Sequence, residues 1–347
     1  MTSIPSDDSL AVSLASESDL AEWQDFADGR EDAGPMHHAG WYGVLRDAFN
    51  APPHFLLVRD GHGCVRGILP MYRGHSVVTG THYSSLEGGI LADSAAARHA
   101  LFVAAMALRE EPKVRFVHIR GDTGTPPIAV PKVHTVVATD GVEGAWRAIR
   151  STERREIRIA RSSGVEVARD ERFESISAFY TLYARRMREF GTPVFGSALF
   201  VAMRDRLGPQ RLRLYAVRHG ERYLGGMLCA VHAKRWTDLY GACEHDAPRG
   251  ANKLLHWRVI SDAAESGAVE FDLGRSIPGG GVHRFKQHMG GRDVAYVYGF
   301  YARDGRRLDA VLSANSGDTV LQRIWQKLPP ILCNWAGPRI RSGLPFL

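Results

Sequence analysis

One succession of elements occurs twice in this chain. Residues 54–72 and 212–230 each read as two extended runs around a glycine-containing turn, which is a β-hairpin signal. A helical segment and then a strand follow each hairpin, at 95–108 and 114–120 in the first copy and at 252–266 and 269–273 in the second. Repetition of a whole succession indicates an internal duplication, although α/β proteins share hairpins by chance. We therefore expect two related domains.

Length and composition agree with this expectation. The chain has 347 residues, of which 44% are hydrophobic and 24% charged, which suits two globular domains with sizeable cores. Its formal net charge of +6 and pI near 9.2 favour anionic ligands such as phosphates, CoA, RNA or acidic lipid headgroups. General arginine-rich usage explains the same charge equally well.

The cysteines and the N-terminal sequence exclude several classes of protein. Cys64, Cys229, Cys243 and Cys333 are scattered, without metal-ligand spacing, so neither a zinc site nor a disulfide framework is indicated. The acidic, serine-containing N-terminus has no basic stretch followed by an apolar one, and no apolar run is long enough to span a membrane. We expect a cytoplasmic protein without a bound metal.

Between the repeats, residues 146–161 predict a helix with a face of arginines, ended by Gly164. That face is either solvated surface or a contact for phosphate or RNA. A second helix is expected at 175–189, where apolar residues recur at helical spacing and should face the core.

The first candidate site is the turn at 245–252. It follows a strand expected at 236–240 and opens the helix of the second repeat. Arginine and glycine at a helix N-terminus suit a pyrophosphate, because free backbone N–H groups and the positive end of the helix dipole meet there. The residues that would bind it are Arg249, Gly250, Ala251 and Asn252. Turn and cap chemistry accounts for the same residues without a ligand.

The second candidate is the glycine-rich stretch 271–291. A strand ends at Asp272-Leu273, and Gly279-Gly280-Gly281 are expected to form a loop, followed by Arg284 and Lys286. Flexible backbone beside cations suits a site that closely approaches an anionic or carbonyl-bearing substrate. The alternative is a mobile surface hairpin.

This stretch also carries a family resemblance. FDLGRS (271–276) followed by GVHRFKQHMGG (281–291) resembles the signature of the FemAB family. Other segments are similar to parts of the same family, namely His38-x-x-Trp41 with Phe49, GILPMY, HYSSLEGGILAD, ERREIRIARSSGVEV and TDLYGAC. YARRMREFGTPVFGSALF and WQKLPPILCNWAGPRIRSGLP resemble the subfamily found beside exopolysaccharide and PEP-CTERM/exosortase loci.

The resemblance implies an α/β (α+β) fold of two tandem GNAT-like domains with mixed sheets flanked by helices. The expected boundaries are 1–145, 146–312 for the transfer domain, and 313–347 for a C-terminal helix and tail. It implies an N-acyltransferase that forms an amide, with acyl-CoA or aminoacyl-tRNA as co-substrate and no permanently bound cofactor. The acceptor would be an amine of a small molecule, glycan or peptide, in cell-envelope or exopolysaccharide metabolism.

The resemblance also implies roles for single residues. Lys286 would neutralise charge on the carbonyl oxygen or hold the donor. Asp272 would orient the acceptor amine or take its proton, unless it forms a structural salt bridge with Arg275. Tyr240 is either a proton donor or part of the core. The expected substrate contacts are Arg275, Arg284, Arg186 and Arg188, and Arg249 to Asn252 would bind the CoA pyrophosphate. A covalent route through Cys243 and His245 is disfavoured, because the family pattern has no such dyad.

A reading from a different class is a non-catalytic protein with this fold that binds a carbohydrate or lipid carrier. Residues 320–347 mix tryptophans and leucines with cations. They either dock on a membrane surface, which would place the protein peripherally at the inner membrane, or pack on the second domain.

Overall fold

The computed structural model describes residues 9–49, 51–76, 79–121, 132–295, 297–303 and 320–341. These residues form two compact units. The first unit holds the described residues up to Gly121 together with 297–303 and 339–341, and the second holds 132–295 and 320–338. Both units are discontinuous in sequence, and each is described by itself.

The described part of the second unit contains a seven-stranded sheet with the order β14-β8-β13-β12-β11-β10-β9. Its strands are β8 (Val133–Ala138), β9 (Val165–Asp170), β10 (Leu212–His219), β11 (Arg222–His232), β12 (Arg235–Cys243), β13 (Glu270–Ser276) and β14 (Arg292–Ala295). All neighbours are antiparallel except β12 and β13, which run parallel. A parallel pair needs a crossover connection, and α8 (Ala251–Glu265) provides it.

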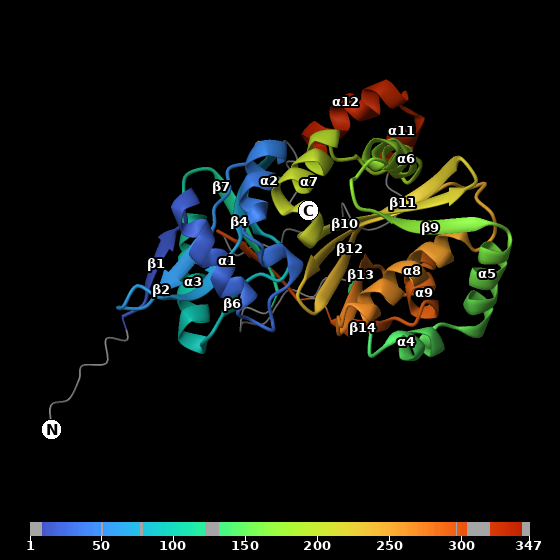
Figure 1. Ribbon diagram of the computed structural model, residues 1–347. Coiled ribbons are helices and arrows are strands. Elements are labelled where there is room, and N and C mark those ends of the chain that lie inside the picture. The colour runs from blue at the N-terminus through green and yellow to red at the C-terminus, as the bar shows by residue number, and fades with distance from the viewer. Residues whose placement is uncertain are drawn as a thin grey trace. The chain divides into compact units, whose positions relative to one another are not determined.

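Helices cover both faces of this sheet. Figure 1 shows α6 on one side and α5 and α8 on the other. The remaining bounds are α4 (Val142–Ala148), α5 (Ser151–Ser162), α6 (Ile176–Glu189), α7 (Ser197–Arg211), α9 (Gly281–His288), α11 (Val320–Lys327) and α12 (Pro330–Arg341). The core under α8 includes Trp236, Leu255 and Phe271, all essentially inaccessible to solvent. The second unit therefore holds β12 and β13 between two packed layers.

The first unit contains two smaller sheets, with the orders β1-β2-β3-β6 and β15-β7-β5-β4. Its strands are β1 (Ala11–Leu14), β2 (Leu56–Arg59), β3 (Val65–Leu69), β4 (Met71–Ser76), β5 (Gly80–Ser85), β6 (Leu91–Ala92), β7 (Val114–Arg120) and β15 (Tyr298–Ala302). Its α-helices are α1 (Leu20–Asp28), α2 (Gly40–Phe49) and α3 (Ala95–Ala107), with short 3₁₀ turns at Glu17–Asp19, Pro35–His37 and Leu108–Glu110.

The two units repeat one topology, as the sequence pattern predicts. Each has an antiparallel hairpin, β2–β3 in the first and β10–β11 in the second. In each, a strand that precedes the crossover helix pairs in parallel with the strand after that helix, β5 with β7 and β12 with β13, and in the first unit the short β6 lies between β5 and α3. The mixed α/β architecture with two related units is confirmed.

Two strands lie in the sheet of the other repeat. β8 follows the first repeat along the chain but pairs with β13 and β14 in the second unit. β15 follows the second repeat and pairs with β7 in the first unit. A boundary at 145/146 assigns β8 to the first domain and β15 to the second, whereas the compact units divide the chain at both strands.

The helix predicted at 146–161 is in fact two helices. α4 ends at Ala148, and Ile149 is extended (ψ 134°) with its side chain buried in the core. The Arg154 guanidinium donates to the carbonyl oxygens of Trp146, Arg147 and Ile149 at 3.3, 2.8 and 2.6 Å, which satisfies acceptors at the end of α4. The break carries no glycine or proline, so residue type did not reveal it. Gly164 (φ +84°) follows α5, as predicted.

Candidate functional site

The parallel strands β12 and β13 form a fork. They pair only between Arg235–Thr237 and Glu270–Asp272, although both strands continue beyond these residues. Each strand has a bulge just past the last pair. In β12 the register against β11 shifts between Asp238 and Tyr240, and in β13 the register against β8 shifts between Asp272 and Arg275. Bulges bend strands and release backbone groups from the ladder, so these groups can bind other partners.

Lys286 lies at this fork and is almost fully buried, with 8% of its surface exposed. Its Nζ donates to the carbonyl oxygens of Gly274 and Arg275 at 2.8 and 2.9 Å. A buried ammonium requires such acceptors, and the bulge of β13 supplies them. The loop predicted at 279–281 is one residue shorter than expected, because the chain is helical from Gly281, and Lys286 therefore projects from α9.

The glycine-rich stretch before α9 is tied to its surroundings. The buried His283 accepts a hydrogen bond from the Gly279 amide at its Nδ1 (2.9 Å) and donates from its Nε2 to the Asp293 carboxylate (2.9 Å). Its tautomer follows from these partners. The alternative of a surface hairpin is therefore wrong, because the segment begins a helix whose orientation His283 fixes.

Asp238, which sequence reasoning missed, occupies the β12 bulge. The residue is half-buried, and its Oδ1 is inaccessible to solvent and has no hydrogen-bond partner among the described residues. Burial raises the pKa of its carboxyl to about 7; the nearby Asp272 also raises that pKa, while the positive charge of Lys286 lowers it. One signal was available, since aspartate is depleted inside strands and TDLYGAC places one there.

Asp272 holds the bulge of β13 in place. Its Oδ1 accepts a hydrogen bond from the Gly274 amide at 2.7 Å, and its Oδ2 lies 2.7 Å from Nδ1 of His134 on β8. Gly274 needs its freedom here, because its φ is +75°. Both carboxylate oxygens thus bind protein groups, an arrangement suited to positioning the fork.

Tyr240 follows the β12 bulge and belongs to an aromatic cluster. Its ring centroid lies 5.3 Å from that of Tyr183, 6.0 Å from Phe195 and 5.1 Å from Phe200. Tyr240 and Tyr183 meet edge to face, a favourable aromatic geometry. Tyr240 therefore has a packing role in the structure, and its role in chemistry stays a prediction.

The predicted substrate arginines do not share one location. Arg186 bonds to Glu189 and His245, Arg188 donates to the carbonyl of Leu328 at 3.3 Å, and Arg284 is exposed on α9. Arg275 contributes its carbonyl to Lys286, so it is the one arginine of the set that a hydrogen bond joins directly to the fork among the described residues.

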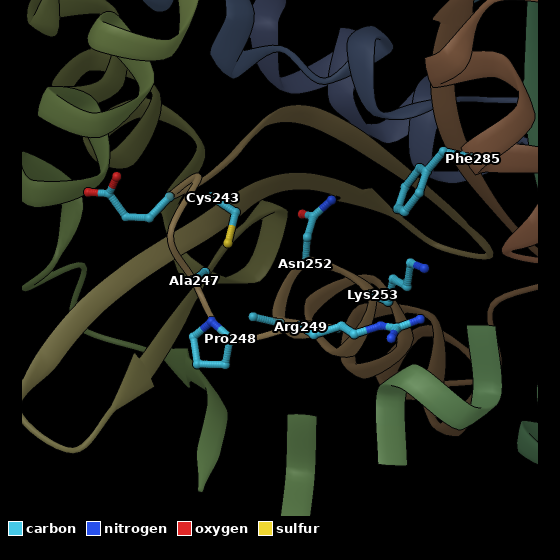
Figure 2. A pocket seen from close by; sticks show the side chains of 10 residues that line it. Cys243, Ala247, Pro248, Arg249, Asn252, Lys253 and Phe285 are labelled. Atoms are coloured by element: carbon cyan, nitrogen blue, oxygen red, sulfur yellow. The ribbon is translucent and has the colours of Figure 1, made fainter. Parts of the chain in front are cut away.

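A cavity of about 280 Å³ lies at the N-terminus of α8, the position of the predicted pyrophosphate site. Figure 2 shows Cys243, Arg249, Asn252 and Phe285 around it. All four predicted residues line it, within the set Cys243, Glu244, Ala247, Pro248, Arg249, Gly250, Ala251, Asn252, Lys253 and Phe285. Gly250 also has a structural reason to be glycine, since a Cβ there would lie 2.2 Å from the Glu156 carbonyl oxygen.

The cations of this cavity are paired with glutamates of α5. Arg249 Nη2 lies 2.8 Å from Glu156 Oε1, and Lys253 contacts both Glu153 and Glu156. Hydrogen bonds from Lys253 and Arg249 lower the pKa of Glu156. The α8 dipole still presents its positive end to the cavity, because the first amide groups of a helix have no intrahelical acceptor.

Two alternative chemistries find little support in this geometry. Burial raises the pKa of Cys243 to about 11, which disfavours a nucleophilic thiolate, and His245 contacts Arg186 and Glu189 instead. In the predicted RNA-binding face, Arg154 caps α4 and Arg158 lies 5.4 Å above the Trp146 ring. These two arginines of the face thus have structural contacts.

Comparison with known proteins agrees with this architecture. Residues 147–287 match a family model described as an acetyltransferase (GNAT) domain. This range begins in α4 and includes the fork, the cavity and Lys286. No curated protein matches the chain.

Solved structures extend the similarity to both units. FemX is 14% identical, with a TM-score of 0.66 over 84% of this chain and 97% of that one. The C-terminal domain of a putative lysylphosphatidylglycerol synthetase from Agrobacterium fabrum is 13% identical (TM-score 0.58; 86% and 94% covered). A tandem GNAT protein from the clavulanic acid biosynthesis pathway is 11% identical (TM-score 0.52; 86% and 100%). The chain therefore has a tandem GNAT-like fold, similar to that of FemX.

Proposed function

We propose that this protein is an N-acyltransferase whose reaction takes place in the fork between β12 and β13. One observation carries the proposal: a half-buried carboxyl, Asp238 on β12, and a buried cation, Lys286 on α9, meet at the fork, and β12 continues from there to the cavity at α8. A group that takes up a proton near neutral pH and a cation that stabilises developing negative charge are what acyl transfer to an amine requires.

The length of β12 from Asp238 to the cavity wall at Cys243 supports an elongated donor. Asp238 and Cys243 are five residues apart on β12, which corresponds to about 17 Å of extended strand. A donor with its phosphates at the α8 N-terminus and its acyl group at the fork therefore needs a long, thin arm, as in a CoA thioester. We favour this donor over aminoacyl-tRNA, because arginines of the predicted RNA face hold α4 and Trp146 instead.

The proposed step is direct transfer. The acceptor amine attacks the acyl carbonyl, a C–N bond forms, the C–S bond of the thioester breaks, and the thiolate leaves with the pair of electrons. The Asp238 carboxylate takes a proton from the attacking nitrogen, and that proton reaches the thiolate or solvent. Lys286 stabilises the negative charge on the carbonyl oxygen and, with Asp272, holds the bulge that shapes the fork.

The acceptor is proposed as an amine on a small molecule, glycan or peptide, in cell-envelope or exopolysaccharide metabolism. The resemblance of 183–200 and 325–345 to the exopolysaccharide-associated subfamily supports this proposal. The aromatic cluster around Tyr240 is a suitable lining for the acceptor, because it borders the β12 bulge that carries Asp238.

The test is a donor-binding experiment followed by turnover. Calorimetric titration of the full chain with a panel of CoA thioesters, and separately with charged tRNA, should give saturable binding of a thioester. Incubation of that thioester with an amine library should then yield an amide and free CoA by mass spectrometry. Binding of a glycan or lipid carrier with no transfer from either donor would favour the non-catalytic alternative and refute the proposal.

A further inference from the structure

The last two described helices expose an unusual set of large apolar side chains. Ile331 and Trp335 on α12 are 79% and 62% exposed, and Leu332 lies beside them. Ile324 on α11 and Phe190 at the end of α6 are also exposed. We call these five residues the C-terminal face. Scattered exposed apolar residues are ordinary, but a concentration on adjoining helices marks an interaction surface.

These helices are held in place by their opposite side. Trp325, Cys333 and Gly337 are buried, and a Cβ at Gly337 would lie 3.1 Å from the Val194 carbonyl oxygen. Hydrogen bonds between α6 and α11 add to this packing, from Gln326 to the Glu189 carbonyl and from Arg188 to the Leu328 carbonyl. Figure 1 shows α11 beside α6 and α12 following it. The exposed face is therefore not the core-facing side of these helices.

All charged residues of these two helices are basic. Residues 320–341 contain four basic residues and no aspartate or glutamate. Arg323 and Lys327 lie one turn apart on α11, next to Ile324, and both are exposed. Arg339 and Arg341 lie in the last turn of α12. Exposed tryptophan and isoleucine on α11 and α12, two helices whose charged residues are all basic, match the surface of an anionic bilayer, where apolar side chains enter the headgroup region and cations meet acidic lipids.

We propose that the C-terminal face binds the surface of an anionic membrane, with Ile331 and Trp335 inserted among the headgroups and Arg323 and Lys327 on acidic lipids. This contact is peripheral. Within the described residues, no helix is long and apolar enough to cross a bilayer. The occupant is identified by charge complementarity, because a protein partner of mixed charge would not require a segment without a single acid.

The proposal is tested by co-sedimentation of the full chain with vesicles. Vesicles of phosphatidylcholine with about 30 mole per cent phosphatidylglycerol should carry the protein into the pellet. Vesicles of pure phosphatidylcholine should carry much less of it. Ile331→Asp with Trp335→Asp should reduce the bound fraction about tenfold or more. The matched control is Val103→Asp, which replaces an exposed valine on α3 in the first unit and should leave binding unchanged.

The electrostatic part has its own variant. Arg323→Glu with Lys327→Glu should weaken binding to anionic vesicles about tenfold or more, and moderate salt should weaken binding of the original chain in the same direction. Arg172→Glu is the control, since Arg172 is highly exposed outside the face. Circular dichroism verifies that each variant is folded.

Three results would overturn the proposal. The protein could stay in the supernatant with anionic vesicles. Binding could persist unchanged in both double variants, which would place the contact elsewhere. Sedimentation velocity could show a dimer that Ile331→Asp with Trp335→Asp dissociates while vesicles bind nothing, which would make the face an interface between copies of the chain.

Discussion

Nδ1 of His134 lies 2.7 Å from Oδ2 of Asp272, joining β8 to β13. The two residues are 138 positions apart in the chain, and His134 is nearly buried. β8 follows the first repeat, so the strand carrying the FemAB-like motif is braced by a segment outside its own repeat. This contact changes the interpretation of Asp272, because both of its oxygens already bind protein groups.

We expect Asp272 to position the fork rather than transfer protons. Asp272→Ala should lower the free energy of unfolding by about 2 kcal/mol, since two charge-assisted hydrogen bonds are lost, while Asp272→Asn should recover most of that loss. Urea unfolding and turnover should be measured on both, with the exposed Asp205→Ala as control. An asparagine variant of normal stability and hundredfold lower turnover would instead make Asp272 the base.

Lys286→Ala separates two roles for the lysine. If Lys286 stabilises the carbonyl oxygen, turnover should fall about a hundredfold with the donor affinity unchanged. Stability should also fall by about 1–3 kcal/mol, because the Gly274 and Arg275 carbonyls lose their donor. Turnover assays measure the rate, and calorimetric titration measures donor affinity. The control is Gln287→Ala, which replaces the exposed neighbour of Lys286. Weaker donor binding at unchanged turnover would show that Lys286 holds the donor.

The repeated succession predicted the architecture well, because hairpins, helices and strands depend on local periodicity. It could not place β8 and β15, since the sheet that a strand joins depends on long-range pairing. The same limit explains the helix break at Ile149, where tertiary burial and the Arg154 contacts override good helix-forming residues.

The candidate site was predicted only in part, because local sequence patterns do not reveal long-range contacts. The motif located Lys286 and Asp272, and turn chemistry located Arg249 to Asn252 at a cavity. Glu153 and Glu156, which pair with the cations of that cavity, lie about a hundred residues earlier on α5, so no local pattern links them to it. Asp238 was missed because its raised pKa arises from burial, which only the folded chain creates.

Glu156→Gln should tighten binding of a CoA donor. Glu156 pairs with both Arg249 and Lys253, so its charge opposes the phosphates that these cations would bind. Removing one negative charge from the cavity should lower Kd several-fold at low ionic strength, with a smaller effect in high salt. Calorimetric titration measures this directly. Glu166→Gln, an exposed glutamate on β9, should have no effect, and weaker binding by Glu156→Gln would mean that the ion pairs shape the donor site.

Asp238 gives the protein a pH dependence with a defined sign. If its carboxylate takes the proton of the amine, kcat/KM should rise with pH through an apparent pKa of about 7. Asp238→Asn should lower turnover about a hundredfold and remove that inflection. The surface variant Asp140→Asn should keep it. A full pH profile of Asp238→Asn that matches the original chain would exclude Asp238 from proton transfer.

The same shift makes an independent prediction for stability. A carboxyl whose pKa is raised on folding favours its neutral form, so its contribution to stability is present below about pH 4 and is lost as pH rises through about 7. Asp238→Asn should therefore match the original chain at pH 4 and exceed it at pH 8, by about 2 kcal/mol because the residue is half-buried. Urea unfolding at both pH values measures this difference. A variant that gains stability as it loses turnover would show that the charge is kept for catalysis at a cost to folding.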